Sequence, residues 1–191
     1  MAIELEHIER NKPKENNTMN EKQFATDAEY NQYVDTLAPA GDAVKVRGFF
    51  HVQIVDGDQI VGDSGWNQNQ VTNLGFNQFL VSALGSIAGS KYVSHMALGT
   101  SGAPAAGDTS LTGEVGTRTA VTAATSSGSK TLRLTATFAA GWHTSAGAFN
   151  ISNIGLYNSS STGTLFAGNT YASSSCASNQ AVNATYDIIF S

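Results

Sequence analysis

The residues that could carry chemistry are few and scattered along this 191-residue chain. The four histidines are His7, His51, His95 and His143. No two of them stand three or four residues apart, so the sequence contains no local motif for zinc or iron. Asp56, Asp58 and Asp63 are close together, but they lack the ligand spacing and the closing Glu of a calcium loop. Turn formation explains these aspartates better than metal binding.

Nucleophiles and phosphate-binding loops are also unsupported. Serine and threonine are abundant, yet no Gly-x-Ser-x-Gly elbow occurs, and the only cysteine, Cys176, lies in a Ser-rich turn without a neighbouring base. The glycine-rich run 99–107 has no lysine after its last glycine. The carboxylates of Asp108, Glu114 and Asp187 have no spacing that would bring them together for glycoside hydrolysis. We therefore expect a protein that is not an enzyme and has no metal or cofactor.

Charge is sparse and unevenly placed. Charged residues make up 13% of the chain. Residues 1–45 hold five Lys/Arg and nine Asp/Glu, whereas residues 46–191 hold five and six. A domain with so few charges has an uncharged polar surface, which suits lasting contact with other subunits. The sequence thus predicts an N-terminal arm over 1–45 and a separate domain over 46–191.

Several partners and locations are disfavoured by composition. The net charge is −5 and Lys/Arg do not cluster, which argues against nucleic acid. No apolar run has membrane-spanning length, and the N-terminus, MAIELEHIERNK, lacks the apolar core of a signal peptide. A single cysteine permits no intrachain disulfide. We expect a soluble product made in a cytoplasm, with stability supplied by burial and assembly.

The arm contains one predicted helix. Phe24 precedes Thr26-Asp-Ala-Glu29, which has the form of a capping box at a helix start. The apolar face that follows consists of Tyr30, Tyr33, Val34 and Leu37. The helix must end before Pro39 and is too short to be stable alone. It must therefore lie against something, either its own domain or a neighbouring subunit.

Residues 46–191 have the pattern of an antiparallel β-sandwich. Short alternating segments are separated by Gly-, Ser- and Asn-rich turns, and one helix starting near Thr72 and ending at Gly89 is inserted among them. The predicted strands are 44–55, a return strand from 59, 92–99, 117–124, 131–138, 149–156, 164–169 and 181–190. The helix carries an apolar stripe that we expect in the core, made of Phe76, Phe79, Leu80, Ala83, Leu84 and Ile87.

A long irregular segment, 99–117, follows Leu98 at the end of a strand. A segment of this length inside a compact domain is usually functional or disordered. Spaced anchors favour a functional surface: Asp108 can cap a local turn, Leu111 can close the end of the sandwich, and Glu114 can pair with Arg118. The glycine and alanine content is explained by close backbone packing.

Several motifs, taken in order, resemble a group of tailed-bacteriophage virion proteins. They are Asn-Gln-Val-Thr-Asn-Leu-Gly-Phe (69–76), Val-Ser-His-Met-Ala-Leu-Gly-Thr (93–100), Ala-Pro-Ala-Ala-Gly-Asp-Thr-Ser-Leu (103–111), Glu114 with Arg118, and Asn-Ile-Gly-Leu-Tyr-Asn (153–158). The resemblance covers about residues 65–191. One departure is Asn153, where the group often has an acidic residue.

The resemblance implies a virion structural protein with a jelly-roll-like sandwich, either a capsid cement (decoration) protein, often trimeric, or a tail, neck or fibre component. On the first hypothesis the partners are the major capsid protein and further copies of the chain, on the capsid surface. The expected interface residues are Phe24, Tyr30, Tyr33, Val34, Leu37, Leu98, Asp108, Leu111, Glu114, Arg118 and Trp142. On the second hypothesis exposed Trp66, Trp142 and Tyr157 stack on sugars, although core packing is the alternative for each.

Overall fold

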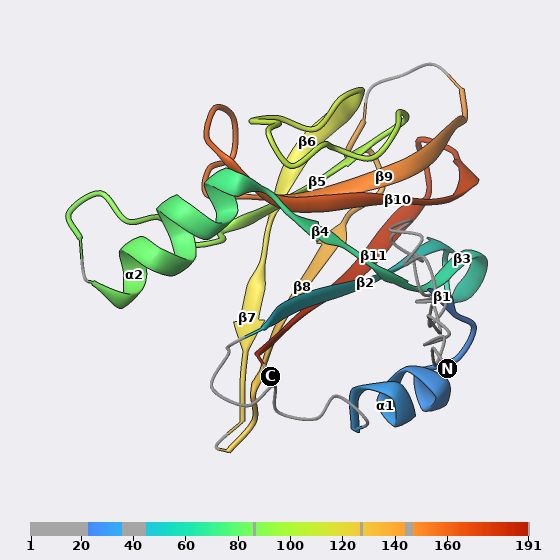
Figure 1. Cartoon of the computed structure of the whole chain (residues 1–191). Coiled ribbons are helices and arrows are strands. Elements are labelled where there is room, and N and C mark those ends of the chain that lie inside the picture. Colours follow the sequence, from blue (N-terminus) through green and yellow to red (C-terminus); the bar gives the residue numbers. More distant parts are fainter. Residues whose placement is uncertain (1–22, 36–44, 86, 127, 144–146, 191) are drawn as a thin grey trace, which may run out of the picture.

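Two antiparallel sheets face each other and enclose the core (Figure 1). The computed structural model describes residues 23–35, 45–85, 87–126, 128–143 and 147–190. One sheet, in the order β1-β3-β2-β11-β8-β7, contains β1 (Gln23–Phe24), β2 (Val46–Asp56), β3 (Gln59–Gln68), β7 (Thr122–Ala124), β8 (Thr131–Phe138) and β11 (Ala181–Phe190). The other, in the order β4-β10-β9-β5-β6, contains β4 (Gln70–Val71), β5 (His95–Gly99), β6 (Glu114–Ala120), β9 (Phe149–Tyr157) and β10 (Leu165–Cys176). The predicted mainly β, antiparallel sandwich is confirmed.

Strand β8 shows why the alternating pattern forms this core. Leu134 and Phe138 are 1% and 0% exposed, whereas Thr135 and Thr137 between them are exposed on the opposite face of the strand. Strand β11 pairs with β8 on one side and with β2 on the other, which places a central row of alternating side chains over the opposite sheet. Burying a large aliphatic or aromatic side chain contributes about 1.5–3 kcal/mol, so this row is a main source of stability.

The predicted strand 117–124 is wrong in one respect, because it is divided between the two sheets. Strand β6 pairs with β5, and β7 pairs with β8 over only three residues. The chain crosses at Val121, whose N–H donates to the carbonyl of Ser94 at 2.9 Å. Gly116 precedes the crossing at φ +65°, where a Cβ would meet the Trp142 ring at 2.5 Å. The alternation of apolar residues does not reveal this close contact between Gly116 and Trp142, so it could not predict where the chain passes from one sheet to the other.

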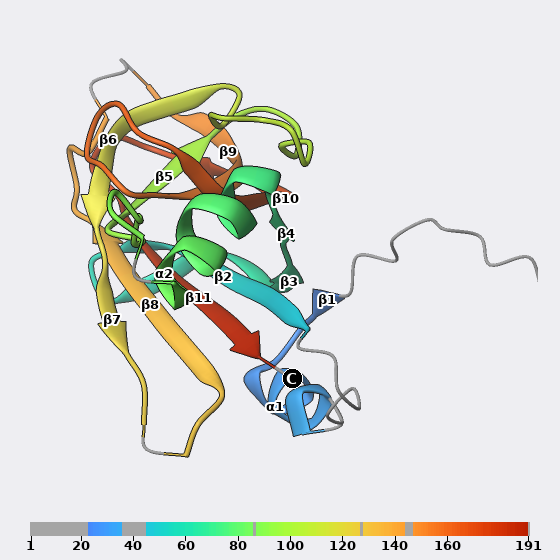
Figure 2. The same ribbon diagram turned by 60° about the vertical axis from the view of Figure 1, so that its left-hand side comes forward.

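The inserted helix also differs from its prediction. It consists of a π-helical segment η1 (Gly75–Val81) followed by a short α2 (Ser82–Leu84), and it projects from one end of the sandwich (Figures 1 and 2). Phe79 of the predicted core stripe is buried at 4% exposure, but Phe76, Leu84 and Ile87 are 42%, 92% and 56% exposed. The expectation that the whole stripe belongs to the core is therefore wrong.

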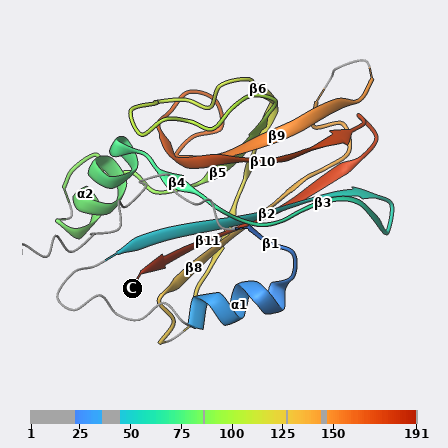
Figure 3. The same ribbon diagram turned by 45° about the vertical axis from the view of Figure 1, so that its right-hand side comes forward.

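Helix α1 (Asp27–Asp35) lies on the outer face of the six-stranded sheet, on the side away from β9 and β10 (Figure 3). Within this chain the described part of the arm is thus seated on its own domain, one of the two arrangements that the sequence left open. A nine-residue helix has little stability by itself, so its contacts with the sheet must hold it in place.

Candidate interaction surfaces

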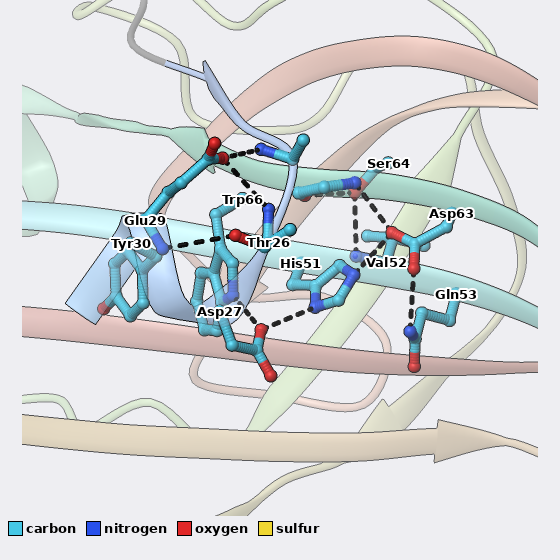
Figure 4. Close-up of polar contacts among 12 residues, drawn as sticks. Thr26, Asp27, Glu29, Tyr30, His51, Val52, Gln53, Asp63, Ser64 and Trp66 are labelled. Atoms are coloured by element: carbon cyan, nitrogen blue, oxygen red, sulfur yellow. Dashed lines mark hydrogen bonds and ion pairs between the residues drawn. The ribbon is translucent and has the colours of Figure 1, made fainter. Parts of the chain in front are cut away.

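The start of α1 is built as the sequence predicts. The Thr26 Oγ1 accepts the Glu29 N–H at 3.2 Å, and the Glu29 carboxylate accepts the N–H groups of Ala25 at 3.0 Å and Thr26 at 3.3 Å (Figure 4). This capping box satisfies backbone donors that the first helical turn leaves without partners. The capping-box prediction is confirmed.

An aromatic seat holds the helix on the sheet. The Tyr30 ring is stacked on Trp66 of β3, with centroids 3.9 Å apart and planes 6° apart, and it also contacts Phe49 of β2 edge-on. Phe24 and Tyr33 pack around this group, to which Ile189 of β11 also belongs. Tyr30 is 2% exposed and Phe49 is fully buried. Three predicted interface residues, Phe24, Tyr30 and Tyr33, therefore meet an intramolecular surface.

A buried carboxylate lies under this seat. Asp187 is 1% exposed and accepts a hydrogen bond from the Tyr30 hydroxyl at 2.6 Å. Arg133 Nε and Nη2 donate to its two oxygens at 2.8 and 2.7 Å. Burial, together with the neighbouring Asp187 charge, raises the pKa of Tyr30 above its ordinary value, so the hydroxyl stays a donor. The hydrogen bonds to Asp187 raise the pKa of Arg133. The arrangement is a satisfied structural network, not an activated acid or base.

A polar rim joins the helix N-terminus to the β2–β3 hairpin (Figure 4). Trp66 Nε1 donates to the Asp27 carboxylate at 2.6 Å, and His51 lies 3.9 Å from Asp27 and 2.5 Å from Asp63. Burial alone would raise the pKa of Asp63, but hydrogen bonds from Gln53, the Gly65 N–H and His51 outweigh it, so the pKa is below its ordinary value. The sequence drew attention to His51, Asp63 and Trp66 for other reasons, and it did not predict that they would meet Asp27 in one rim.

Two predicted arm residues cannot be placed. The backbone of Val34 belongs to α1, but its side chain is not among those described, and Leu37 lies outside the described residues. The interface role predicted for both stays a prediction.

The irregular segment after β5 is anchored inside the sandwich end. Leu111 is 4% exposed and packs with Ala97, Tyr157 and Leu165. Its N–H donates to the Tyr157 hydroxyl at 2.5 Å. Asp108 closes a local turn, because its carboxylate accepts the N–H of Ala105 at 2.9 Å. The predicted roles of Leu111 and Asp108 within the fold are confirmed.

Arg118 ties this segment to the far end of β9. Its Nε and Nη2 donate to the Glu114 carboxylate at 2.7 and 3.0 Å, and its guanidinium lies 3.4 Å from the centroid of the Tyr157 ring. Its Nη1 donates to the carbonyls of Ser159 and Thr162. With a side chain 8% exposed, Arg118 is an internal brace. Burial of the Tyr157 hydroxyl raises its pKa to about 12, although the hydrogen bond from the Leu111 N–H acts in the opposite direction and lowers the pKa.

Asn153 binds the irregular segment at two points. Its Nδ2 donates to the carbonyls of Gly102 and Thr112, both at 3.0 Å. A carboxylate could not make either bond, since it has no donor when ionised. The amide therefore holds both ends of the irregular segment, and among the described residues Glu114 supplies the carboxylate for Arg118.

Other predicted contact residues belong to the interior. Leu98 and Trp142 are 0% and 7% exposed and lie in the main core cluster. Trp66 and Tyr157 are 3% and 0% exposed. The premise that Trp66, Trp142 and Tyr157 are exposed for sugar stacking is wrong, and core packing is their role.

A large uncovered apolar surface includes three residues, Phe76, Leu84 and Ile87, that the sequence pattern placed in the core. We define the apolar helical face by five exposed side chains, Phe76, Val81 and Leu84 of the helical segment and Ile87 and Tyr92 of the chain that follows it, with exposures of 42%, 59%, 92%, 56% and 77%. Beside it lies an apolar hollow of about 270 Å³. The hollow is lined by Phe79, Leu80, Lys91, Tyr92, Val93, Ala123, Leu132, Leu134, Phe166, Ile188 and Phe190. Large exposed apolar patches on soluble domains mark sites of contact with another molecule.

In the described part of the chain, no group of three or more His, Cys, Asp or Glu side chains is placed to hold a metal ion. None of the described helices is long and apolar enough to cross a membrane. Comparisons with models of protein families, with curated proteins and with solved structures find no match to this chain.

Proposed function

We propose that this chain is a non-enzymatic structural protein of a bacteriophage virion, a capsid cement or decoration protein that binds the assembled head and stabilises it. The observation that carries the proposal is the apolar helical face, because five large apolar side chains on one projecting segment need a partner to cover them. The virion context rests on the resemblance of the motifs between 69 and 158 to tailed-phage virion proteins. The proposed partners are the major capsid protein and other copies of this chain, as a trimer with a jelly-roll-like sandwich.

The polar groups of the described site residues support an assembly role over catalysis. Asp187 is bound by Arg133 and Tyr30, and Glu114 is bound by Arg118. These carboxylates stabilise segments of the fold and are committed to internal partners. Perturbed titratable groups occur in structural ion-pair networks as well as in catalytic sites. Here the Tyr30–Arg133–Asp187 network borders a hollow, but its groups are bound to one another and hold the helix in place.

The arm has two parts in this proposal. Residues 23–35 anchor the arm to its own sandwich through the Tyr30 seat, and residues 1–22 contact the shell. Shell attachment then combines many weak, symmetry-related contacts, which gives strong binding by multivalency.

Binding to purified shells tests the proposal. A chain lacking residues 1–22 keeps the whole α1 seat, so it should fold while losing most of its co-sedimentation with shells. The matched control is Thr135→Ser, a change on the exposed face of β8. If the full chain does not co-sediment with shells, or binds only purified tails, the decoration role is wrong. Retention of full binding after the truncation would refute the arm's part alone.

The tail or fibre alternative has lost the observation that motivated it, since the three aromatic residues invoked for sugar stacking are buried.

A further inference from the structure

The two ends of the sandwich differ in charge. Of the 11 charged residues between 46 and 191, four form two internal pairs, Arg118 with Glu114 and Arg133 with Asp187. The strand β2 starts beside Arg47 and ends at Asp56. At about 3.3 Å per residue, its 11 residues separate these ends by roughly 35 Å. Three of the other charges, Asp56, Asp58 and Asp63, belong to the hairpin, and Asp108 is bound to the Ala105 N–H in a turn of the irregular segment.

The end that carries the apolar helical face is basic. Lys91 lines the hollow, and its ammonium donates to the neutral side chains of Gln78 and Thr164, so its charge is not neutralised by a carboxylate among the described residues. Lys130 is exposed and directly precedes β8, and its carbonyl accepts the N–H of Phe190, a lining residue of the hollow, at 2.9 Å. Residues 72–95 contain no Asp or Glu. An apolar surface with a basic rim therefore faces outward here.

The opposite end is the tip of the β2–β3 hairpin, and it is apolar and acidic. Ile60 and Val61 are 57% and 54% exposed there, next to a register irregularity in the pairing of β2 with β3. Asp56 and Asp58 are exposed at the turn, and Asp63 lies further along β3 with His51 beside it. Figures 1 and 3 both show this hairpin and α2 at opposite ends of the molecule.

We propose that the β2–β3 hairpin tip of one copy docks on the apolar helical face of the next, with Ile60 and Val61 entering the hollow and Asp56 and Asp58 meeting Lys91 and Lys130. A 270 Å³ hollow has room for a branched aliphatic side chain, since a cavity of about 150 Å³ holds benzene. The contact joins different surfaces of identical chains, so it forms a ring where the rotation closes. The inference rests on the self-assembly part of the proposed function.

Two variants, each lacking one of the two contact surfaces, test this arrangement by sedimentation velocity. Ile60→Ser with Val61→Ser removes the two exposed apolar side chains of the hairpin tip. Leu84→Ser with Ile87→Ser removes two of the five apolar side chains of the apolar helical face. Both pairs are surface changes, and circular dichroism checks that each variant is folded. Each variant alone should lose self-association at least tenfold relative to the full chain. A mixture of the two should form 1:1 dimers and nothing larger, because one intact contact remains. The matched control, Thr135→Ser, should assemble like the full chain.

Several outcomes overturn the inference. Undiminished assembly of the hairpin variant means that two helical faces meet each other. Assembly abolished by removal of residues 1–22, with the hairpin variant unaffected, means that the arm covers the face. A monomeric full chain at millimolar concentration excludes the contact outright. A monomer that still binds shells refutes this inference and leaves the decoration role standing, whereas assembly without shell binding refutes only the decoration role.

Charge reversal provides a second readout. Asp58→Lys should weaken self-association, and adding Lys91→Glu in the same chain should restore it, since each copy contributes both surfaces. High salt should weaken the native contact because exposed charge pairs are screened. Failure of the double reversal to restore association would contradict the proposed pairing of the two ends.

Discussion

Removing a single hydroxyl at Tyr30 should loosen helix α1 without unfolding the sandwich. In Tyr30→Phe the ring keeps its stacking on Trp66, but the 2.6 Å hydrogen bond to buried Asp187 is lost. A hydrogen bond to a charged group contributes about 1.5–3 kcal/mol. Asp187 retains both bonds from Arg133, so the free energy that holds α1 on the sheet should fall by about 2 kcal/mol. This corresponds to roughly a 30-fold change in the equilibrium for opening of the helix.

Hydrogen exchange measured by mass spectrometry checks this expectation. Amides of α1 should exchange about 30-fold faster in Tyr30→Phe, while those of β8 and β11 keep their native rates. Tyr30→Ala removes the ring as well and should cost about 3–5 kcal/mol, enough to detach the helix. Trp66 then becomes exposed and its fluorescence shifts to the red, whereas core Trp142 is unaffected.

Tyr92→Phe is the matched control, since Tyr92 is 77% exposed and is not part of the aromatic seat. It should leave α1 exchange unchanged in the monomer. The account of the seat is refuted if neither Tyr30 variant alters exchange in α1. It is also refuted if Tyr30→Phe accelerates exchange equally throughout the sandwich, which would make the helix part of one cooperative unit with the sheets.

Three further perturbations follow from the same structure. Leu111→Ser should lower the free energy of unfolding by about 3 kcal/mol or more and the melting temperature by roughly 6–12 °C, because it empties a buried apolar site; unchanged calorimetry of domain and assembly would exclude the plug role. Glu114→Gln should cost about 1–3 kcal/mol in denaturant unfolding, with Thr112→Ser as an exposed control, since it weakens the charged bonds to Arg118. Because the pKa of Asp63 is lowered in the fold, the stabilisation that its carboxylate provides is present above about pH 4 and disappears as the pH falls through the native pKa. Asp63→Asn should therefore reduce the dependence of the free energy of unfolding on pH in this acid range. An identical pH profile for the two proteins would contradict this expectation.

The features predicted correctly from the sequence are those that depend on neighbouring residues. The capping box depends on residues three apart, Thr26 and Glu29, and it is present as predicted. The alternation of β8 likewise depends on the strand alone. The seat of α1 could not be predicted in this way, because it combines Tyr30 with Asp187, 157 residues away. One signal was available: Phe49 and Phe50 are adjacent in a strand, and alternation can bury both only if each face is covered.

The apolar stripe of the inserted helix shows a second feature that the sequence could not predict. Spacing predicts that Phe76, Leu84 and Ile87 share an apolar surface, but it does not say which chain covers that surface. Here only Phe79 and its close neighbours reach the core, because the segment projects from the sandwich end. The path through Val121 was hidden for a different reason: the crossing depends on Gly116 and Trp142 meeting in space.

The copy number of the chain in purified virions tests the central claim most directly. Quantitative mass spectrometry would compare it with the major capsid protein and with a tail protein of the same particle. A decoration protein should be present in a fixed, simple ratio to the major capsid protein. A copy number matching that of the tail or neck, or absence from the particle, would contradict the proposed function.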